Sequence, residues 1–406
     1  MKKFNKNILV FIFCMLFVGV GLCSGDLLKG IGEACDDFLN GKASKFTRIE
    51  KLEKKIDGLS TEKIRYHDNM MDVNSIKENV LGTRVVFKDG DTIVKFDSGS
   101  IGVSEDKIPE VQVKQIASSV LKLKDVSEKN GADFLYCAVP TKQMYEVYPS
   151  NVESYARDNY ELFLSTLKNM GIPTLDFANI MDSNGITDPD IFYRTDHHWK
   201  VGSGFAATKA ICEELNRRYD FYYNSEYTDI NNYNKKIYPD WLLGFRGRQV
   251  GRLFSWYGAD DFELITPCFE TNMTEEQPIK NEVRKGRFED SVLFMDNIEE
   301  NYQKKDYYNW DPYSIYSGGS FRLQIMKNNL ISNGKKILII RDSFAMVVTP
   351  FLALHTSELH ICDVRNNEDY VGEKLNMKEY INEIKPDYVL VLYNGVLNSQ
   401  NRYNFF

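Results

Sequence analysis

One short stretch of this sequence sets side chains together that could do acid–base chemistry. Residues 191–200 read IFYRTDHHWK and hold two of the chain's five histidines. A carboxylate two residues before an imidazole can orient one ring nitrogen and leave the other to take a proton from a nucleophile. We therefore predict His198 as a general base and Asp196 as its orienting residue. His197 is expected to pack and Trp199 to line the core or the pocket, and both stay candidates for substrate contact.

A nucleophile for this base is available far along the chain. In ILIIRDSFAMVV the apolar run 337–340 predicts a buried strand, and Asp342 and Ser343 follow at its carboxyl end. Reactive groups gather at such strand ends in open α/β sheets, and a helix that begins there offers free N–H groups to an oxyanion. We predict Ser343 as the nucleophile. The alternative is that Ser343 or Asp342 only caps the following helix.

A metal site is the chemical rival of this arrangement. Asp196, His197 and His198 all carry metal-ligating atoms, but adjacent histidines rarely bind one ion together. The seven cysteines show no CxxC spacing. We expect no metal, and no motif predicts a cofactor. The remaining histidines lack zincin spacing: His67, His355 and His360.

The elements that must position these residues follow an α/β pattern. The runs KKILIIRDSF, SELHICDVR and PDYVLVLYNG are short, apolar and separated by helix-length segments, as strands of a buried parallel sheet are. ADFLYCAVP predicts another buried strand, and helices are predicted at 110–130 and 155–170. The segment SGFAATKAICEELNRR predicts a helix directly after the histidine motif, so that motif lies on the loop that leads into it.

Other segments frame this core. TRVVFKDGDTIVKF has Asp89-Gly90 between β-branched runs, which predicts a hairpin. Residues 218–330 are irregular, aromatic and polar, with hairpins expected at 249–266 and 290–296. We predict an α/β sandwich around a central parallel sheet, with an inserted β and loop-rich region at 218–330.

The N-terminal part is expected to direct export. Three lysines precede the uncharged run ILVFIFCMLFVGVGLC, which is short for a spanning helix of about 20 residues. We predict a signal peptide or membrane anchor at 1–25, a helical spacer at 26–80 and the α/β domain at 81–406. The protein is then extracytoplasmic, either secreted or anchored to the cell membrane.

Charge and aromatic content narrow the classes of partner. A net charge of −8 provides no general field for phosphates, so we expect no nucleic-acid partner. Tyrosines and tryptophans crowd the polar stretches NYQKKDYYNWDPYSIY and RRYDFYYNSEYTDINNYNKKIYPDW. These rings can either stack on sugars or fill the core of the inserted region, and the sequence leaves both open.

The strings TDHHW and RDSF together resemble the DHHW family of exported bacterial proteins, which is similar to the SGNH-hydrolase-like domain of alginate O-acetyltransferases. The resemblance spans roughly 81–398, and it implies a three-layer SGNH-hydrolase-like fold. It also implies Ser343 as nucleophile, His198 as general base and Asp196 as its orienting residue. VPTKQMYEVYP resembles a Pro-x-Lys loop of that domain and adds Lys142 as a candidate.

The sequence departs from these relatives beside the nucleophile. Arg341 replaces the glycine of a Gly-Asp-Ser block, which weakens the inference of an active hydrolase, although Arg341 could contact an anionic group. Tyr393 and Asn394 follow the strand YVLVL and could offer O–H or N–H groups to an oxyanion, with turn or cap roles as the alternative for Asn394.

The resemblance implies an O-acetyltransferase or acetylesterase that modifies a cell-surface or secreted polysaccharide through an acetyl-serine intermediate. It also implies a membrane-bound O-acyltransferase as the partner that supplies acetyl groups. Arg341 and the aromatic segments favour the alternative, a catalytically silent glycan-binding or scaffold protein of an acetylation complex. Hydrogen-bond contact between Ser343 and His198 would discriminate between the two.

Overall fold

The computed structural model describes residues 67–183, 191–332, 334–365, 372–397 and 401–406, and the chain divides between Val80 and Leu81 into two units. Within the first unit the described element is helix α4 (His67–Val80). The predicted leader at 1–25 and residues 26–66 of the predicted spacer at 26–80 lie outside the described residues. Across the described ranges, no helix combines the length and apolar character needed to cross a bilayer.

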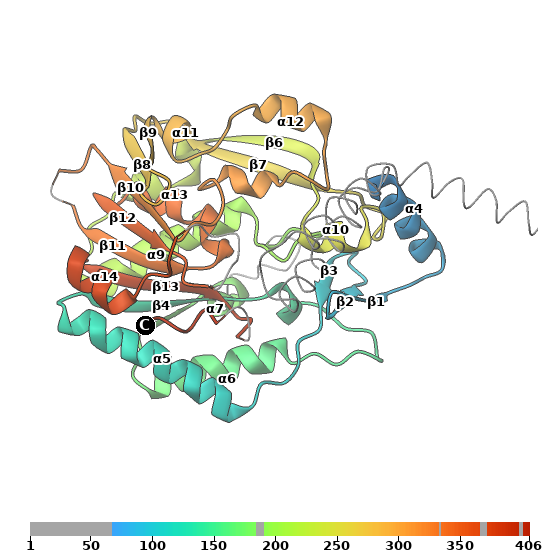
Figure 1. Cartoon of the computed structure of the whole chain (residues 1–406), viewed down its shortest axis with the longest axis horizontal. Helices are drawn as coiled ribbons and strands as arrows, with labels where there is room; N and C mark the ends of the chain where they lie inside the picture. Colours follow the sequence, from blue (N-terminus) through green and yellow to red (C-terminus); the bar gives the residue numbers. More distant parts are fainter. Residues whose placement is uncertain (1–66, 184–190, 333, 366–371, 398–400) are drawn as a thin grey trace, which may run out of the picture. The chain divides into compact units, whose positions relative to one another are not determined.

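A sheet of eight strands forms the centre of the second unit, in the order β5-β4-β13-β11-β12-β10-β8-β9 (Figure 1). The strands from β5 to β12 pair in parallel, and β10, β8 and β9 extend the sheet with antiparallel pairs. The predicted α/β fold with a central parallel sheet is confirmed. The strands are β4 (Asp133–Val139), β5 (Thr174–Asp176), β8 (Met273–Gln277), β9 (Glu282–Gly286), β10 (Leu323–Asn328), β11 (Lys336–Arg341), β12 (Glu358–Cys362) and β13 (Tyr388–Asn394).

Helices cover both faces of this sheet, which is why its parallel strands are apolar without alternation (Figure 1). On β11, Ile337 and Ile339 pack into one core, and Leu338 and Ile340 pack into the other. Helices α7, α9 and α13 pack on the first core, and α5, α6 and α14 pack on the second. Their bounds are α5 (Glu110–Lys129), α6 (Ala156–Asn169), α7 (Phe177–Ser183), α9 (Val201–Tyr219), α13 (Thr349–Ala353) and α14 (Met377–Ile384).

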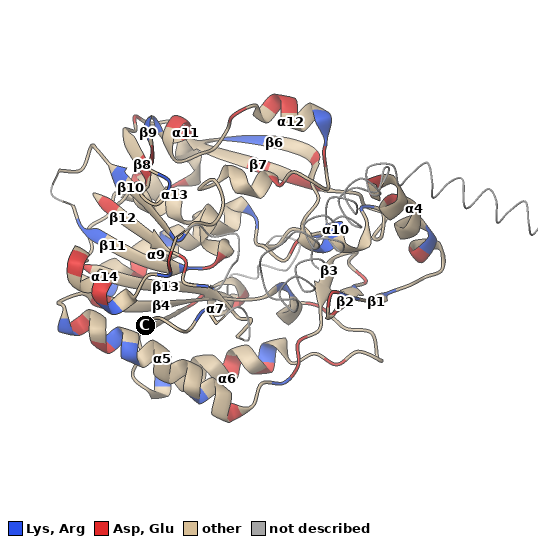
Figure 2. Cartoon of the chain, in the orientation of Figure 1, with Lys and Arg blue, Asp and Glu red and all other residues tan. Residues whose placement is uncertain are grey.

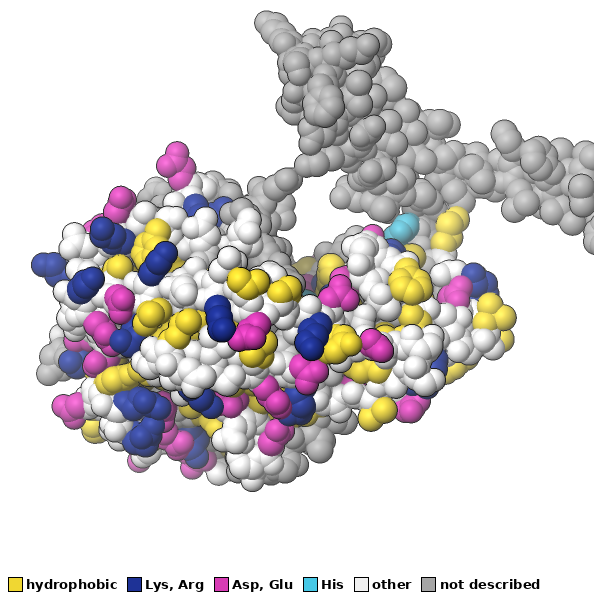
Figure 3. Space-filling model, turned by 90° about the horizontal axis from the view of Figure 1, so that it is seen from below, with side chains coloured by type: hydrophobic (Ala, Val, Ile, Leu, Met, Phe, Trp, Pro, Cys, Tyr) yellow, Lys and Arg dark blue, Asp and Glu magenta, His cyan; other side chains and the backbone are white. Residues whose placement is uncertain are grey.

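The outer sides of α5 and α6 are covered by charges of both signs. Acidic and basic side chains are interspersed on the face that Figure 3 shows. Within α5 they form i,i+4 ion pairs, Glu110 with Lys114 and Lys124 with Glu128. Such exposed pairs contribute only about 0.3–0.5 kcal/mol each, so burial of the apolar inner side holds the helix in place.

A small antiparallel sheet of β1 (Val85–Lys88), β2 (Asp91–Lys95) and β3 (Ile101–Val103) precedes α5. Asp89 and Gly90 both have positive φ, 54° and 83°, as the predicted two-residue hairpin turn requires. The Ile101 N–H donates to the Arg194 carbonyl over 2.9 Å. This small sheet therefore supports the loop that carries the histidine motif.

The region at 218–330 is less separate than predicted, because β8, β9 and β10 join the central sheet. The hairpin predicted at 249–266 is wrong. Residues 245–250 form α10, and β7 pairs with β6 instead. The hairpin predicted at 290–296 is also wrong, since a short helix, α11, ends at Ser291 and Leu293 bridges to Tyr316. The elements are β6 (Tyr233–Leu242), α10 (Phe245–Val250), β7 (Asp260–Pro267), α11 (Phe288–Ser291) and α12 (Ile298–Lys304).

Candidate active site

The histidine motif forms a tight loop whose ends are tied together. Phe192 and Trp199 form a β-bridge, and the Tyr193 N–H donates to the His198 carbonyl over 3.1 Å. Helix α9 begins two residues beyond Trp199, as predicted. The Trp199 ring is fully buried, and its indole N–H donates to the Phe344 carbonyl over 2.8 Å. Trp199 therefore fastens the motif to the turn that holds Ser343.

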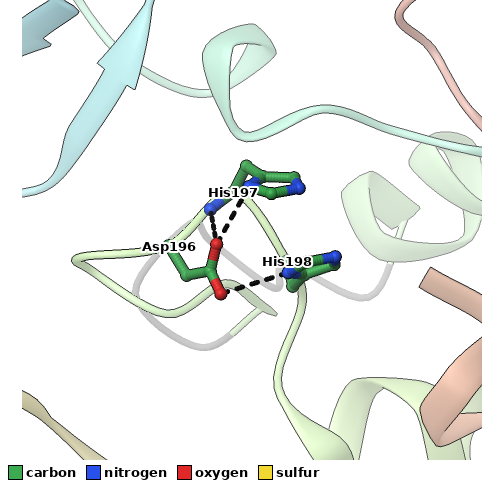
Figure 4. A group of neighbouring side chains, drawn as sticks. All are labelled: Asp196, His197 and His198. Atoms are coloured by element: carbon green, nitrogen blue, oxygen red, sulfur yellow. Dashed lines mark hydrogen bonds and ion pairs between the residues drawn. The ribbon is translucent and has the colours of Figure 1, made fainter. Parts of the chain in front are cut away.

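A continuous hydrogen-bonded chain runs from Asp196 through His198 to Ser343. Asp196 Oδ2 lies 3.1 Å from His198 Nδ1 (Figure 4), and His198 Nε2 lies 2.6 Å from Ser343 Oγ. A carboxylate that accepts from Nδ1–H fixes the tautomer in which Nε2 accepts from the serine hydroxyl. The three residues thus have the geometry of a nucleophile, a base and an orienting group.

The environment keeps Asp196 charged. Burial by itself raises its pKa, but His198 and His197 outweigh burial through their charge and hydrogen bonds and hold the pKa of Asp196 well below its usual range. The second oxygen, Oδ1, accepts the His197 backbone N–H over 2.7 Å. Both carboxylate oxygens are therefore held in place.

Close backbone contact fixes the position of Asp196. A Cβ at Gly244, just before α10, would lie 2.2 Å from the Asp196 Cβ, so only glycine fits there. On the other side, Asp260 at the start of β7 accepts from the Thr195 N–H over 2.7 Å and from its hydroxyl over 2.6 Å. Sequence reasoning missed both residues, since each is distant along the chain and lies in the irregular region.

The nucleophile turn is capped by its aspartate. Asp342 Oδ1 accepts from the Phe344 N–H over 3.0 Å at the start of a 3₁₀ helix, Ser343–Val347. The capping alternative therefore holds for Asp342, while the Ser343 hydroxyl contacts His198. Among the described residues, no acceptor pairs with the Ser343 N–H. That group is a candidate oxyanion donor.

A buried network locks this turn to the C-terminal segment. Asp342 Oδ2 accepts from Arg402 Nη1 and from the Asn394 N–H, each over 2.8 Å. Asn394 Oδ1 accepts from the Val396 N–H over 2.9 Å and from Arg402 Nη2 over 3.2 Å. This fixes the amide so that Nδ2 has no acceptor among the described residues, which makes it a second candidate oxyanion donor.

Three of the predicted oxyanion or substrate-binding candidates make hydrogen bonds to other parts of the chain, and their contact with substrate stays a prediction. Arg341 is buried and donates to the Gly319 carbonyl and the Ser320 hydroxyl. Lys142 is buried and donates to the carbonyls of Ile101 and Arg194. The Tyr393 hydroxyl donates to the Arg402 carbonyl over 3.0 Å. In each case a buried polar group satisfies backbone carbonyls of a neighbouring loop.

The cluster of Asp196, His197 and His198 brings its ligand atoms within 4.8 Å of one another, the spacing a metal needs. Figure 4 shows the two imidazole rings beside each other. Their centroids are 3.9 Å apart and their planes differ by 36°. Asp196 already occupies Nδ1 of both rings, through a hydrogen bond to His198 and an ion pair to His197. The geometry fits hydrogen bonding better than a shared metal.

His197 and His198 face different neighbours. Burial and the nearby His198 lower the pKa of His197 to about 4, although its side chain remains about one-third exposed at 31%. The His198 ring stacks on Tyr313, with centroids 4.5 Å apart. Tyr313 and Tyr316 are buried, so the core alternative holds for these aromatic residues of the inserted region.

A cleft of about 330 Å³ adjoins the nucleophile turn. Phe344 and Asn394 line it on the side of Ser343, and His197 lines it beside His198. The lining also includes residues of the hairpin turn of the small sheet and of the connection between β3 and α5, among them Glu105. Sequence reasoning did not single out Glu105.

Comparisons with known proteins match part of the sequence and the fold. Residues 104–233 match the family model described as SGNH hydrolase-like domain, acetyltransferase AlgX. The match supports the predicted SGNH-hydrolase-like fold. The matched range includes Asp196 and His198, and Ser343 lies beyond it. No curated protein matches the sequence.

Solved structures extend the likeness beyond that range. PatB1 from Bacillus cereus superposes with a TM-score of 0.63 at 18% identity, covering 78% of this chain and 100% of PatB1. The same protein with a sulfonyl adduct gives 0.62 at 18%, covering 78% and 98%. A DHHW family protein from Eubacterium siraeum gives 0.56 at 18%, covering 77% and 92%. The predicted resemblance is confirmed, and at this identity these structures establish the fold alone.

Proposed function

We propose that this protein is an O-acetyltransferase, or an acetylesterase, that forms an acetyl-serine intermediate on Ser343. The observation that carries the proposal is the 2.6 Å contact between His198 Nε2 and Ser343 Oγ, continued by Asp196 on the other ring nitrogen. The family model matched by residues 104–233 is described as an acetyltransferase, which supports the same chemistry.

The first half-reaction transfers an acetyl group to the serine. Ser343 Oγ attacks the acetyl carbonyl carbon while His198 Nε2 takes the hydroxyl proton, and Asp196 stabilises the resulting imidazolium. The oxyanion receives hydrogen bonds from the Ser343 N–H and from Asn394 Nδ2. The intermediate collapses as the bond to the leaving group breaks, and His198 returns the proton to that group.

The second half-reaction reverses these roles. An acceptor hydroxyl loses its proton to His198 and attacks the acetyl-serine carbonyl. The Ser343 Oγ–acetyl bond then breaks, and Oγ regains a proton from His198. A sugar hydroxyl as acceptor makes the protein a transferase, whereas water makes it an esterase.

We propose a cell-surface or secreted polysaccharide as the acceptor, a membrane-bound O-acyltransferase as the source of acetyl groups, and an extracytoplasmic location. These follow from the resemblance to the DHHW and alginate O-acetyltransferase families. The silent-protein alternative rested partly on Arg341, whose guanidinium binds a neighbouring loop and leaves the cleft free.

Release of p-nitrophenol from p-nitrophenyl acetate by the purified protein tests the proposal. We expect turnover in the wild type and its loss in Ser343→Ala and His198→Ala, with near-ultraviolet circular dichroism unchanged. Wild-type turnover that survives Ser343→Ala would contradict the proposed nucleophile. Stoichiometric metal in active protein would favour the metal alternative.

A further inference from the structure

The cleft beside the nucleophile has an unbalanced charge. Three carboxyl groups line it, those of Asp91, Glu105 and Asp106, against one guanidinium, that of Arg246. Arg246 Nη1 is already ion-paired with Asp91 Oδ2 over 2.5 Å. The connection between β3 and α5, which carries Glu105 and Asp106, is marked by acidic colour in Figure 2. The charged residues that line the cleft therefore carry a net negative charge.

Glu105 is held rigidly at this wall. Its N–H donates to the Ser154 hydroxyl over 3.1 Å, and its carbonyl accepts from the Tyr155 N–H over 2.8 Å. Among the described residues, neither its Oε1 nor the neighbouring Thr141 hydroxyl makes a hydrogen bond of good geometry, although both atoms are buried and the hydroxyl is near enough to lower the pKa of Glu105. Buried polar atoms without partners are uncommon and costly, and here they border a cleft that a ligand can enter.

The other charged groups near Glu105 do not neutralise the negative charge of its carboxylate. The charge of Arg402 lowers the pKa of Glu105 and so favours its ionised form, but that guanidinium is itself paired with Asp342. His197, which also lines the cleft, is neutral above a pKa of about 4. Burial raises the pKa of Glu105 to about 7, against smaller effects of the Thr141 hydroxyl and Arg402. The carboxyl can thus accept a hydrogen bond and, when protonated, also donate one.

We propose that the acceptor bound in this cleft is a glycan without carboxylates, and that Glu105 binds its hydroxyl groups and discriminates against polyuronates. This inference rests on the proposed acetyl transfer. A polyuronate places a carboxylate on every sugar, which the acidic wall repels. An uncharged sugar instead brings hydroxyl donors that satisfy Glu105 and the Thr141 hydroxyl.

Binding to the Ser343→Ala protein separates acceptor recognition from catalysis. At pH 8, where Glu105 is mostly ionised, calorimetry compares chitopentaose and cellopentaose with pentamannuronate. We expect at least one uncharged pentasaccharide to bind about tenfold more tightly than pentamannuronate at low salt, with the difference reduced in 0.5 M NaCl. Equal or tighter binding of pentamannuronate, or no binding of any of the three, overturns the proposal.

Substitution of Glu105 tests the residue itself. In the Ser343→Ala background, Glu105→Ala should weaken binding of the uncharged glycan about tenfold, because a charged hydrogen bond is lost. Glu105→Gln should reduce the ratio between the affinities for the uncharged pentasaccharide and for pentamannuronate several-fold. Glu110→Gln, an equivalent change at an exposed position on α5, should alter neither value. Unchanged binding in both Glu105 variants contradicts the assignment.

An acetyl-transfer assay then tests the proposed function and the proposed class of acceptor together. With p-nitrophenyl acetate as donor, mass spectrometry should find more acetylated uncharged pentasaccharide than acetylated pentamannuronate. Without Ser343-dependent release of p-nitrophenol, the proposed function fails whatever binds. Release together with preferred transfer to pentamannuronate leaves the proposed function standing and overturns the acceptor class.

Discussion

Two carboxylate-x-histidine pairs in this protein share one spacing and differ in what they face. In the motif loop, Asp196 contacts His198 Nδ1, and His198 Nε2 contacts the Ser343 hydroxyl. On β12, Glu358 contacts His360 Nε2 over 2.5 Å, and His360 Nδ1 contacts the Tyr380 hydroxyl over 2.6 Å. Each imidazole is thus bonded to a carboxylate on one side and a hydroxyl on the other.

The difference lies in the hydroxyl and its surroundings. Ser343 starts a 3₁₀ helix at the end of β11, has an unpaired N–H among the described residues, and directly precedes Phe344, which lines the cleft. Tyr380 lies within α14, where its side chain packs into the core with Met377 and Ile381. A carboxylate and an imidazole do not make a catalytic base by themselves. What distinguishes the proposed catalytic pair is that its partner is a primary alcohol at the end of a strand, next to a residue that lines a cleft.

Removal of the nucleophile or the base should have the largest effect. We expect Ser343→Ala and His198→Ala to lower kcat for p-nitrophenyl acetate by roughly a thousandfold or more, because proton transfer and covalent catalysis are both lost. The matched change in the other pair, His360→Ala, should keep kcat within about twofold. A comparable loss in His360→Ala would erase the distinction between the pairs.

The carboxylates of the two pairs should give the next largest difference in kcat. Asp196→Asn should lower kcat by roughly a hundredfold or more, since an amide favours the wrong imidazole tautomer, whereas Glu358→Gln should leave kcat nearly unchanged. Stopped-flow assays at saturating donor measure both. Similar kcat values for Asp196→Asn and wild type would show that Asp196 does not orient the base.

A smaller effect on activity is expected from Arg402, which supports the nucleophile turn through Asp342. Arg402→Met leaves a buried carboxylate unpaired, which should cost about 3–5 kcal/mol in the free energy of unfolding and reduce kcat roughly tenfold. Arg365→Met, which breaks the Asp363 pair after β12, serves as the control. It should reduce stability without reducing kcat, as urea unfolding and kinetics on the same samples would establish.

A third buried histidine should affect stability alone. Neither ring nitrogen of His355 has a hydrogen-bond partner among the described residues, and burial lowers its pKa to about 4. The unfolded chain takes this proton near pH 6.5, so between about pH 4 and 6.5 it binds more protons than the folded chain. The free energy of unfolding should therefore fall as the pH drops through that window.

His355→Leu removes this titration. Relative to wild type, the variant should gain about 2 kcal/mol in the free energy of unfolding between pH 7.5 and pH 5, with kcat unchanged. Urea unfolding at the two pH values measures the gain. An identical pH dependence in both proteins would mean that His355 is not buried in its neutral form.

Local patterns were enough to predict the parallel strands of the sheet and the contact between Asp196 and His198. The parallel strands are buried on both faces and so appear as continuous apolar runs, and an i,i+2 pair needs no long-range information. Strand β6 gave no such signal, since Lys235, Lys236 and Pro239 interrupt it and its register shifts after Tyr238. The false hairpin at 249–266 followed from missing that strand.

The supporting residues could not be predicted, because their roles depend on long-range contacts. Nothing near Gly244 in the sequence indicates that Asp196 packs against it, and Arg402 meets Asp342 across 60 residues of chain. For Arg341, in contrast, the sequence suggested a role that its contacts do not indicate. Its place beside Ser343 in the sequence indicated a cation in the site, but its guanidinium turns to Gly319 and Ser320.

Covalent labelling of the serine tests the central claim most directly, since it requires neither the natural donor nor the acceptor. Phenylmethylsulfonyl fluoride reacts with a serine that a neighbouring base has activated. Intact-mass and peptide mass spectrometry should find one sulfonyl group on Ser343 in the wild type, none in Ser343→Ala, and much slower labelling in His198→Ala than in His360→Ala. An unlabelled wild type, or equal labelling rates in the two histidine variants, would contradict the account.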